Sequence, residues 1–395
     1  MSSSMLLSLS ETLNTSEAAL RLLISIFLGL PIALLHRYTL YGKCPVFQHI
    51  FFATCGVLIC LWNYGLNILH SAAAMYVTYR VLKRLGGTSL SVVIIFVFNM
   101  AHLLCGYYMT STDDYDIKWT MPQCVLTLRL IGLAFNLLDG QKPEEKLSAS
   151  QKQVALKEQP TFLEIAAFAY FPGSFLVGPQ FSMKRYLDYV NGRYTMIDTN
   201  TVCTTFGLTY NGKDEKGRPL WNGCENVKLL KFETATQFND YILSFNINTN
   251  NWCAEYIYKR LKFLGSKIYS QFFTLAFLAV WHGLHSGYYV CFFLEFIIMY
   301  AEKDLSQILK RQQKLQSLLN SRPELQILTW ILMHMYTFIF MGYCLVCFTF
   351  LSYPRYHQVY FSIYYCGHII YLSYPLISLL VKISFLKKRS KKFEQ

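Results

Sequence analysis

Long apolar runs separated by short polar segments dominate the chain. A helix needs about 20 predominantly apolar residues to cross a bilayer core, so runs near this length predict membrane-spanning helices. The expected spans lie at about 20–36, 46–62, 64–82, 88–108, 121–138, 161–178, 267–281, 283–300, 325–350 and 360–384. The pattern therefore predicts an all-α, polytopic transmembrane fold, with residues 1–395 forming a single membrane-embedded domain.

The run at 161–178 departs from a plain spanning helix because it contains Pro172 and Gly173. Proline removes a helical hydrogen bond and clashes with the preceding turn. Irregular backbone persists at membrane depth only where protein buries it or where it lines a cavity. We therefore expect broken helix from Pro172 to Pro179, including Gly178, beside an internal tunnel.

Three polar or mixed segments separate the apolar runs. Residues 182–227 contain repeated Asn-Gly turns and predict an extramembrane loop. Residues 228–264 end in AEYIYKRLKFL, whose basic and aromatic composition is typical of a helix at the membrane interface. Residues 301–324 predict a charged amphipathic helix that ends near Pro323. Together they leave the apolar runs to build the core.

Charge supports the membrane assignment. The chain is 53% hydrophobic and only 15% charged, yet its net charge is +13. The basic residues stand mostly between apolar runs and in the tail KKRSKK at 387–392. Such juxtamembrane charge faces the cytosol and anionic headgroups, which predicts a cytosolic C-terminus. No polar basic domain is available for nucleic acid, so we expect no nucleic-acid partner.

Most of the twelve cysteines lie within apolar runs, where a free thiol behaves as a small hydrophobe. Cys344 and Cys347 form one CxxC pair within an apolar run, but no second pair follows at zinc-site spacing, so no metal site is expected. A disulfide between Cys203 and Cys224 would require a luminal loop, and the sequence leaves that side open. Asn14 begins a weak glycosylation sequon.

The segment AVWHGLHSGYYV carries the first candidate chemistry. His282 lies between two apolar runs, and Gly283 and Gly287 permit close approach of backbone or substrate. An imidazole in apolar surroundings stays neutral and can accept a proton as a general base. His285 is expected on the same helix face. The alternative interpretation is that His282 only packs helices; a metal site lacks a nearby acidic partner.

The second candidate is SFNINTNNW, with amides at Asn246, Asn248, Asn250 and Asn251. Such a cluster commonly forms a turn or helix cap. The functional interpretation is that one asparagine hydrogen-bonds an oxyanion or orients a hydroxyl. The sequence has no GxSxG motif, no P-loop and no internal repeat, which argues against a serine hydrolase, a nucleotide hydrolase and a transporter built from repeats.

Four blocks in order resemble the membrane-bound O-acyltransferase family: DYDIKWTMPQCVLTLRLIGLA, FLVGPQFSM, FNINTNNW and WHG followed by GYYVCFFLEF. The resemblance implies a catalytic tunnel within the membrane. It assigns catalysis to His282 and Asn246. The resemblance further implies substrate contacts from five residues, Trp281, His285, Tyr288, Gly178 and Pro179.

The resemblance also implies a reaction. Acyl-CoA serves as co-substrate, without cofactor or metal, and the acceptor is the free sn-2 hydroxyl of lysophosphatidylcholine, lysophosphatidylethanolamine or lysophosphatidylserine. Polyunsaturated chains are the expected cargo, and the endoplasmic-reticulum membrane is the expected location. Two alternatives stay open: a protein, sterol or diacylglycerol acceptor, or membrane transport. The oligomeric state is not indicated.

One departure from the family concerns the middle of the chain. Family members carry further hydrophobic spans between the block that ends near Asn200 and the block that begins near Val202. Here YVNGRYTMIDTN continues directly into TVCTTFGLTYNG. The sequence leaves open whether these spans are truly absent from the protein; if they are, part of the family core is missing and activity itself is in question.

Overall fold

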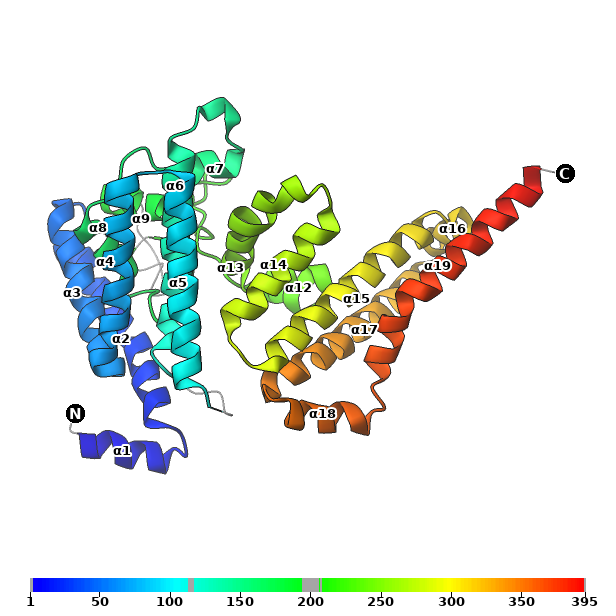
Figure 1. Cartoon of the computed structure of the whole chain (residues 1–395), viewed down its shortest axis with the longest axis horizontal. Helices are drawn as coiled ribbons and strands as arrows, with labels where there is room; N and C mark the ends of the chain where they lie inside the picture. Colours follow the sequence, from blue (N-terminus) through cyan, green and yellow to red (C-terminus); the bar gives the residue numbers. More distant parts are fainter. Residues whose placement is uncertain (1–2, 113–116, 194–205, 207, 394–395) are drawn as a thin grey trace. The chain divides into compact units, whose positions relative to one another are not determined.

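The computed structural model describes residues 3–112, 117–193, 206 and 208–393. Every regular element within these ranges is a helix, apart from two single antiparallel bridges, Lys213 with Pro219 and Val227 with Phe245. Figure 1 shows the helices in chain order. The prediction of an all-α fold is confirmed.

The chain divides into two compact units. Unit 1 comprises Met1–Thr112, Asp116–Asn226 and Ile247–Leu261, whereas unit 2 comprises Asp113–Tyr115, Val227–Asn246 and Lys262–Gln395. The chain therefore passes between the units more than once, and each unit combines segments that are distant in sequence.

Unit 1 is built around helix α6 (Thr120–Gly140), whose residues are mostly buried. Side-chain caps begin several short helices of this unit. For example, Thr161 and Glu164 form a reciprocal capping box at the start of α8 (Phe162–Ala169). The other helices of the unit are α1 (Ser3–Thr12), α2 (Glu17–Thr39), α3 (Pro45–Tyr64), α4 (Ile68–Leu85), α5 (Ser89–Thr110), α7 (Ala149–Val154), α8 (Phe162–Ala169), α9 (Met183–Val190) and α13 (Ile247–Cys253). A π-helical turn, Ala254–Tyr258, and a 3₁₀ segment, Lys259–Leu264, follow α13.

Unit 2 packs long helices around a core of cysteine, aliphatic and tyrosine side chains. Its helices are α11 (Leu229–Glu233), α12 (Phe238–Ser244), α14 (Lys267–His282), α15 (Ser286–Lys310), α16 (Gln313–Ser321), α17 (Pro323–Phe350), α18 (Tyr353–Ser362) and α19 (Cys366–Phe393). Helix α15 contacts α12, α14, α17 and α19, so it forms the spine of the unit.

Five helical stretches among the described residues are long and apolar enough to cross a membrane: Glu17–Thr39, Pro45–Leu85, Ser89–Thr110, Thr120–Gly140 and Pro323–Phe350. The second stretch contains α3 and α4, joined by a 3₁₀ turn at Gly65–Asn67. Many of their large apolar side chains are exposed, as expected for helices that face lipid. These stretches support a multi-pass membrane protein.

Two segment predictions need correction. The expected loop at 182–227 begins with helix α9, because Ser182 caps its N-terminus and Tyr186 and Tyr189 bury one face. The single helix expected over 301–324 does not form: α15 continues to Lys310, α16 is separate, and Pro323 begins α17. Proline fits the first turn of a helix, where its missing N–H is not needed.

The prediction of a broken helix at 161–178 is confirmed. Helix α8 ends at Ala169, and turns follow up to a cis peptide between Gly178 and Pro179. The buried side chain of Arg129 donates to the carbonyl oxygens of Phe168 and Ala169 at 2.9 and 3.2 Å. Its other terminal nitrogen donates to both oxygens of Ser174 and to the carbonyl of Pro179. One arginine thus satisfies backbone groups that the broken helix leaves unpaired.

Candidate active site

The corner between α14 and α15 places His282. Ser266 caps the start of α14, and His282 is the last helical residue. Gly283 then adopts a φ of +145°, a conformation that side chains with a Cβ rarely adopt. The helix therefore ends immediately after the histidine, and the imidazole stands at a turn rather than inside a continuous helix.

Backbone contact fixes the protonation pattern of His282. Its Nδ1 lies 2.7 Å from the carbonyl oxygen of Leu278, one turn earlier. A carbonyl only accepts hydrogen bonds, so Nδ1 carries the proton and Nε2 presents a lone pair. Within unit 2, no described residue forms a hydrogen bond with Nε2. The ring is thus oriented as an acceptor, as a general base requires.

Four aromatic rings surround the imidazole. Their centroids lie 4.7 Å away for Trp281, 5.7 Å for Tyr288, 5.1 Å for Phe292 and 5.4 Å for Phe348. The rings come from α14, α15 and α17. These four rings hold the imidazole in one orientation.

His285 does not share a helix face with His282, contrary to the sequence-based expectation. Gly283 ends α14 between them, and His285 has extended backbone as the N-cap residue of α15. Its ring contacts Tyr288 at a centroid distance of 6.2 Å. His285 therefore adjoins the aromatic cluster through Tyr288, from a different element.

Gly287 confirms the expectation of close approach. A Cβ at this position would lie 2.0 Å from the carbonyl oxygen of Cys347 and 2.8 Å from that of Leu351. Its own N–H donates to the Leu351 carbonyl at 2.9 Å. The start of α15 is therefore fastened directly to the end of α17, beside the rings that hold His282.

Asn246 also belongs to unit 2. It follows α12 and has a φ of +49°, in the left-handed region that asparagine adopts more readily than most residues. Its half-buried side chain forms no hydrogen bond with another described residue of the unit. Its backbone is therefore specified while its amide is available, which suits a hydrogen-bonding role.

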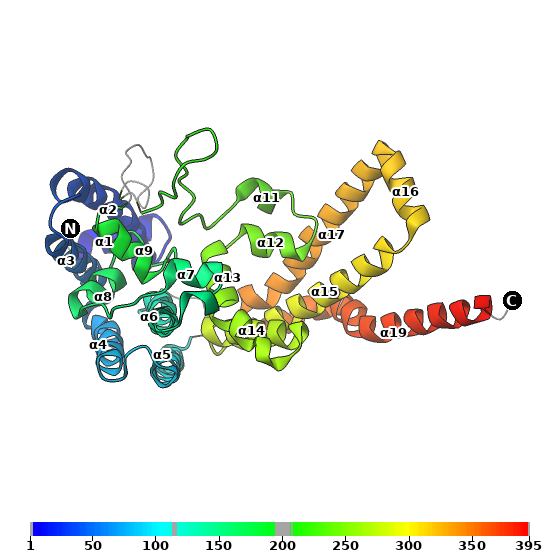
Figure 2. The ribbon, with the colours of Figure 1, turned by 90° about the horizontal axis from the view of Figure 1, so that it is seen from above.

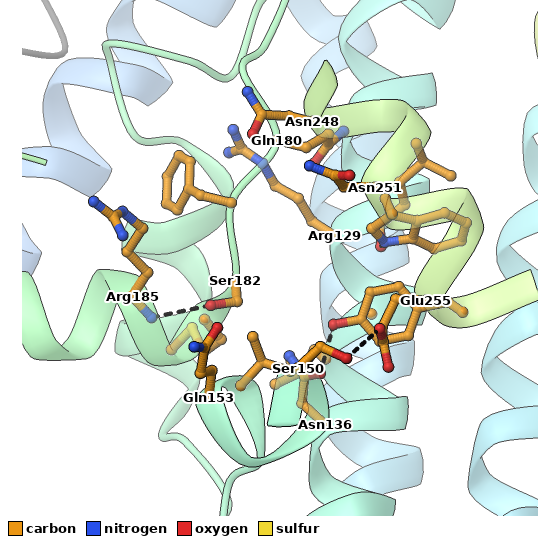
Figure 3. A pocket seen from close by; sticks show the side chains of 18 of the residues that line it. Arg129, Asn136, Ser150, Gln153, Gln180, Ser182, Arg185, Asn248, Asn251 and Glu255 are labelled. Atoms are coloured by element: carbon orange, nitrogen blue, oxygen red, sulfur yellow. Dashed lines mark hydrogen bonds between the residues drawn. The ribbon is translucent and has the colours of Figure 1, made fainter. Parts of the chain in front are cut away.

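Gly178 and Pro179 belong to unit 1, so they are not part of the cluster around His282 within unit 2. They lie instead near a cavity of about 600 Å³, whose wall includes the neighbouring Gln180. Figure 3 shows Gln180, Asn248 and Asn251 along one side of this cavity. The buried Oε1 of Gln180 has no hydrogen-bond partner among the described residues, although its amide nitrogen donates to the Val125 carbonyl.

The floor of this cavity is held by the segment after Asn251. Trp252 donates to the carbonyl of Leu128 at 3.0 Å, and Tyr256 donates to Asn136 at 2.6 Å. The π-helical turn at Ala254–Tyr258 allows both side chains to face α6. The first part of the segment predicted as an interfacial helix, AEYIY at 254–258, therefore packs inside unit 1 against α6.

A sequence model for the membrane-bound O-acyltransferase family matches residues 104–200 and 194–346 of this chain. The matched region includes both Asn246 and His282. The chain belongs to this acyltransferase family. The resemblance noted in the sequence is confirmed. The site is therefore interpreted as that of an O-acyltransferase.

Individual members of the family are similar over most of the chain. Lysophospholipid acyltransferase 5 of Mus musculus is 39% identical, with 92% of this chain and 89% of the relative covered. The Homo sapiens protein of that name gives the same values. The Drosophila melanogaster protein is 38% identical over 88% of this chain and 84% of its own length.

The alignment with the mouse relative also shows a difference in length. The alignment with the mouse relative covers 435 positions, whereas this chain has 395 residues, so at least 40 aligned positions lack a counterpart here. The two family matches meet at 194–200. The junction expected between Asn200 and Val202 lies outside the described residues, as does Cys203 of the suggested disulfide; Cys224 is buried.

Sequence reasoning missed several parts of the site. The ring of Phe348 arrives from α17, and Leu278 contributes only its carbonyl oxygen, so neither residue type signals a role. Gln180 was visible only as part of the motif that contains Gly178 and Pro179. Its polar side chain at the end of an apolar run was the available signal.

Proposed function

We propose that this acyltransferase moves an acyl chain from acyl-CoA to the free sn-2 hydroxyl of a lysophospholipid. The observation that carries the proposal is the imidazole of His282, whose tautomer leaves Nε2 as a proton acceptor amid apolar rings. The similarity to lysophospholipid acyltransferase 5 supports a lysophospholipid acceptor.

In the proposed reaction, Nε2 of His282 accepts the proton of the acceptor hydroxyl. The resulting oxygen attacks the thioester carbonyl and forms the ester, while the carbon–sulfur bond breaks. The amide of Asn246 hydrogen-bonds the developing oxyanion or orients the hydroxyl. The products are a diacyl phospholipid and free CoA, and neither a covalent acyl-enzyme nor a metal is required.

The cavity of unit 1 is our proposed site for the polar part of CoA. The pantetheine arm has amide groups, and the wall of this cavity has the amides of Gln180, Asn248 and Asn251. An N–H of the ligand would satisfy the buried Oε1 of Gln180. Lys259 and Arg185 are also in the wall. Lys259 is paired with Glu255 there, so Arg185 is the cation that suits a phosphate group.

An apolar cleft of about 330 Å³ between α14 and α15 is our proposed site for an acyl chain. Only apolar and aromatic residues line it, including Ala279 and Phe292. Phe292 also packs on the ring of His282, so the cleft adjoins the proposed base. Burial of methylene groups there is favourable by roughly 0.8 kcal/mol each relative to water.

The deciding experiment uses the purified full chain with a matrix of substrates. Saturated and polyunsaturated acyl-CoAs are combined with lysophosphatidylcholine, lysophosphatidylethanolamine and lysophosphatidylserine, and with a diacylglycerol, a sterol and a peptide as competing acceptors. We expect transfer to the lysophospholipids, abolished in the H282A variant. Transfer only to another acceptor class would replace the proposed substrate, and no transfer by a folded protein would overturn the proposal.

We further propose that the protein resides in the endoplasmic-reticulum membrane with its C-terminus in the cytosol. The basic run at 387–392 supports this orientation, because positive residues beside a span favour the cytosolic side. A C-terminal tag should be digested by protease in intact microsomes. A tag that is protected until detergent is added would contradict the orientation.

A further inference from the structure

Helix α12 begins against a carboxylate carried by α15. The backbone N–H of Phe238 donates to both carboxylate oxygens of Glu302, at 3.1 and 3.3 Å. This N–H belongs to the first turn of α12, where a helix offers no partner of its own, so the carboxyl group of Glu302 supplies the missing acceptor. Glu302 therefore fixes the first residue of α12 on α15, far along the chain.

Two further contacts hold the same point. The side chain of Phe238 is only 1% exposed and belongs to a core cluster with Leu294 and Ile298 of α15. His334 of α17 lies with its Nδ1 3.0 Å from the carbonyl oxygen of Ala235, so it donates there. Figure 2 shows α12 beside α15. The start of α12 thus has a defined position on two long helices.

Asn246 is connected to that point through a short, well-bonded segment. Helix α12 has seven residues and is about 10 Å long. The N–H of Phe245 donates to the Tyr241 carbonyl at 2.8 Å, and Lys228 donates to the Ser244 carbonyl at 2.7 Å. A shift at the start of α12 is therefore carried to Asn246, two residues beyond the helix.

Helix α15 also positions the other proposed catalytic residue. Tyr288 and Phe292, in its first two turns, pack on the ring of His282. Glu302 lies 14 positions after Tyr288 on the same helix, about 21 Å along its axis. One continuous helix thus carries the contacts that set both His282 and the segment leading to Asn246.

We propose that Glu302 is a positioning residue that aligns Asn246 with His282 through α12. The inference rests on the proposed function, because it assumes that both side chains act on one reaction. Misplacement of a catalytic group by about 1 Å can reduce turnover about 10²-fold. A purely stabilising role would instead lower the amount of folded protein without acting through Asn246.

The experiment compares E302A, E302Q, N246A and the double variant E302A/N246A in the purified full chain. We expect E302A to lower kcat about 10–100-fold, with both KM values within about threefold. E302Q keeps an acceptor oxygen and should retain most of the kcat. In the N246A background, E302A should reduce kcat by no more than about twofold, since both changes affect the same group.

The matched control is D304N, on the same helix. The carboxylate of Asp304 accepts from Tyr374 and Ser378 of α19 rather than from α12. We expect kcat to stay within about threefold of wild type. Backbone hydrogen exchange of residues 236–246 should accelerate in E302A and stay unchanged in D304N.

The outcomes separate this inference from the proposed function. Additive losses in E302A/N246A, or unchanged hydrogen exchange in E302A, would overturn the positioning role even in an active enzyme. If the folded wild-type protein transfers no acyl chain, the proposed function fails. Accelerated exchange confined to E302A would still support the structural link to Asn246 in that case.

Discussion

Arg129 in unit 1 and His282 in unit 2 are both polar side chains in apolar surroundings, but their hydrogen bonds differ. The terminal nitrogens of Arg129 donate to several backbone oxygens between residues 168 and 179. Among the described residues of its unit, His282 forms one hydrogen bond, to the Leu278 carbonyl in its own helix, and its Nε2 has no partner. The first side chain completes the backbone, whereas the second retains a free acceptor.

The difference indicates how a buried polar residue in a membrane protein is to be interpreted. Such residues are costly and therefore suggest function. The cost of Arg129 is offset by carbonyl groups that a broken helix leaves unpaired. The cost of His282 has no comparable structural compensation, so chemistry is the better explanation. Variants at the two positions should accordingly separate folding from turnover.

The largest effect is expected at His282. Replacement by alanine removes the proposed base and should lower kcat by about 10²–10⁴-fold, with folding preserved. The measurement is acyl transfer by equal amounts of monodisperse protein. His285 is the internal control, and H285A should be much milder because, among the described residues, its ring contacts Tyr288 and not His282. Loss of turnover in H285A but not in H282A would reassign the base.

Arg129 should give the opposite result. R129M leaves several buried carbonyl groups without donors, at about 1–3 kcal/mol each, so we expect a marked fall in thermal stability and yield. R129K keeps the charge and should be intermediate. R80M, which replaces an exposed arginine, is the control, and its thermal stability should differ little from that of the wild type. A stable R129M protein that lacks turnover would show that Arg129 acts in the reaction.

Replacement of Asn246 should lower turnover, as at His282, rather than stability, as at Arg129. Loss of a single oxyanion donor typically lowers kcat about 10²–10³-fold, and N246A should fall in this range with KM little changed. Substitution also tests the backbone, since φ is +49° at this position. N246G retains that conformation without the amide. Equal losses in N246A and N246G would assign the effect to the side chain, whereas an active N246G would assign it to the backbone.

The smallest effect is expected in the cavity of unit 1. N251A removes an exposed amide from its wall and should raise the KM for acyl-CoA about 3–10-fold with kcat unchanged, equivalent to roughly 1 kcal/mol of binding. N320A, an exposed asparagine of unit 2, is the control. An unchanged KM for acyl-CoA in N251A would argue against the donor site proposed there.

The sequence predicted features that depend on local chemistry. Apolar length indicated the helical membrane fold, and Pro172 with Gly173 indicated the break after α8. The end of the helix at His282 was harder to predict from the sequence. The pattern suggested one face for His282 and His285, but the turn at Gly283 separates them. A glycine is tolerated in many helices, so its presence alone did not specify this end.

Features that depend on distant residues could not be derived in this way. Arg129 bonds to carbonyl groups 39 to 50 positions further along the chain, and these groups are the same in every residue type. The ring of Phe348 reaches His282 from another helix. Glu302 looked like one charge in an amphipathic segment until its contact with Phe238 was known. Only the assembled helices reveal such partners.

The hydrogen bond between His282 and the Leu278 carbonyl has a consequence for the proton that His282 takes from the acceptor hydroxyl. The imidazole is oriented by a neutral carbonyl of its own helix, and its ring neighbours are aromatic. No acidic side chain among the described residues contacts this ring, so an imidazolium formed there would be short-lived. The departing CoA thiolate is a negative charge that the reaction creates after the oxyanion collapses. Passing the proton to that sulfur would return the histidine to its starting form, and each cycle would release a neutral thiol.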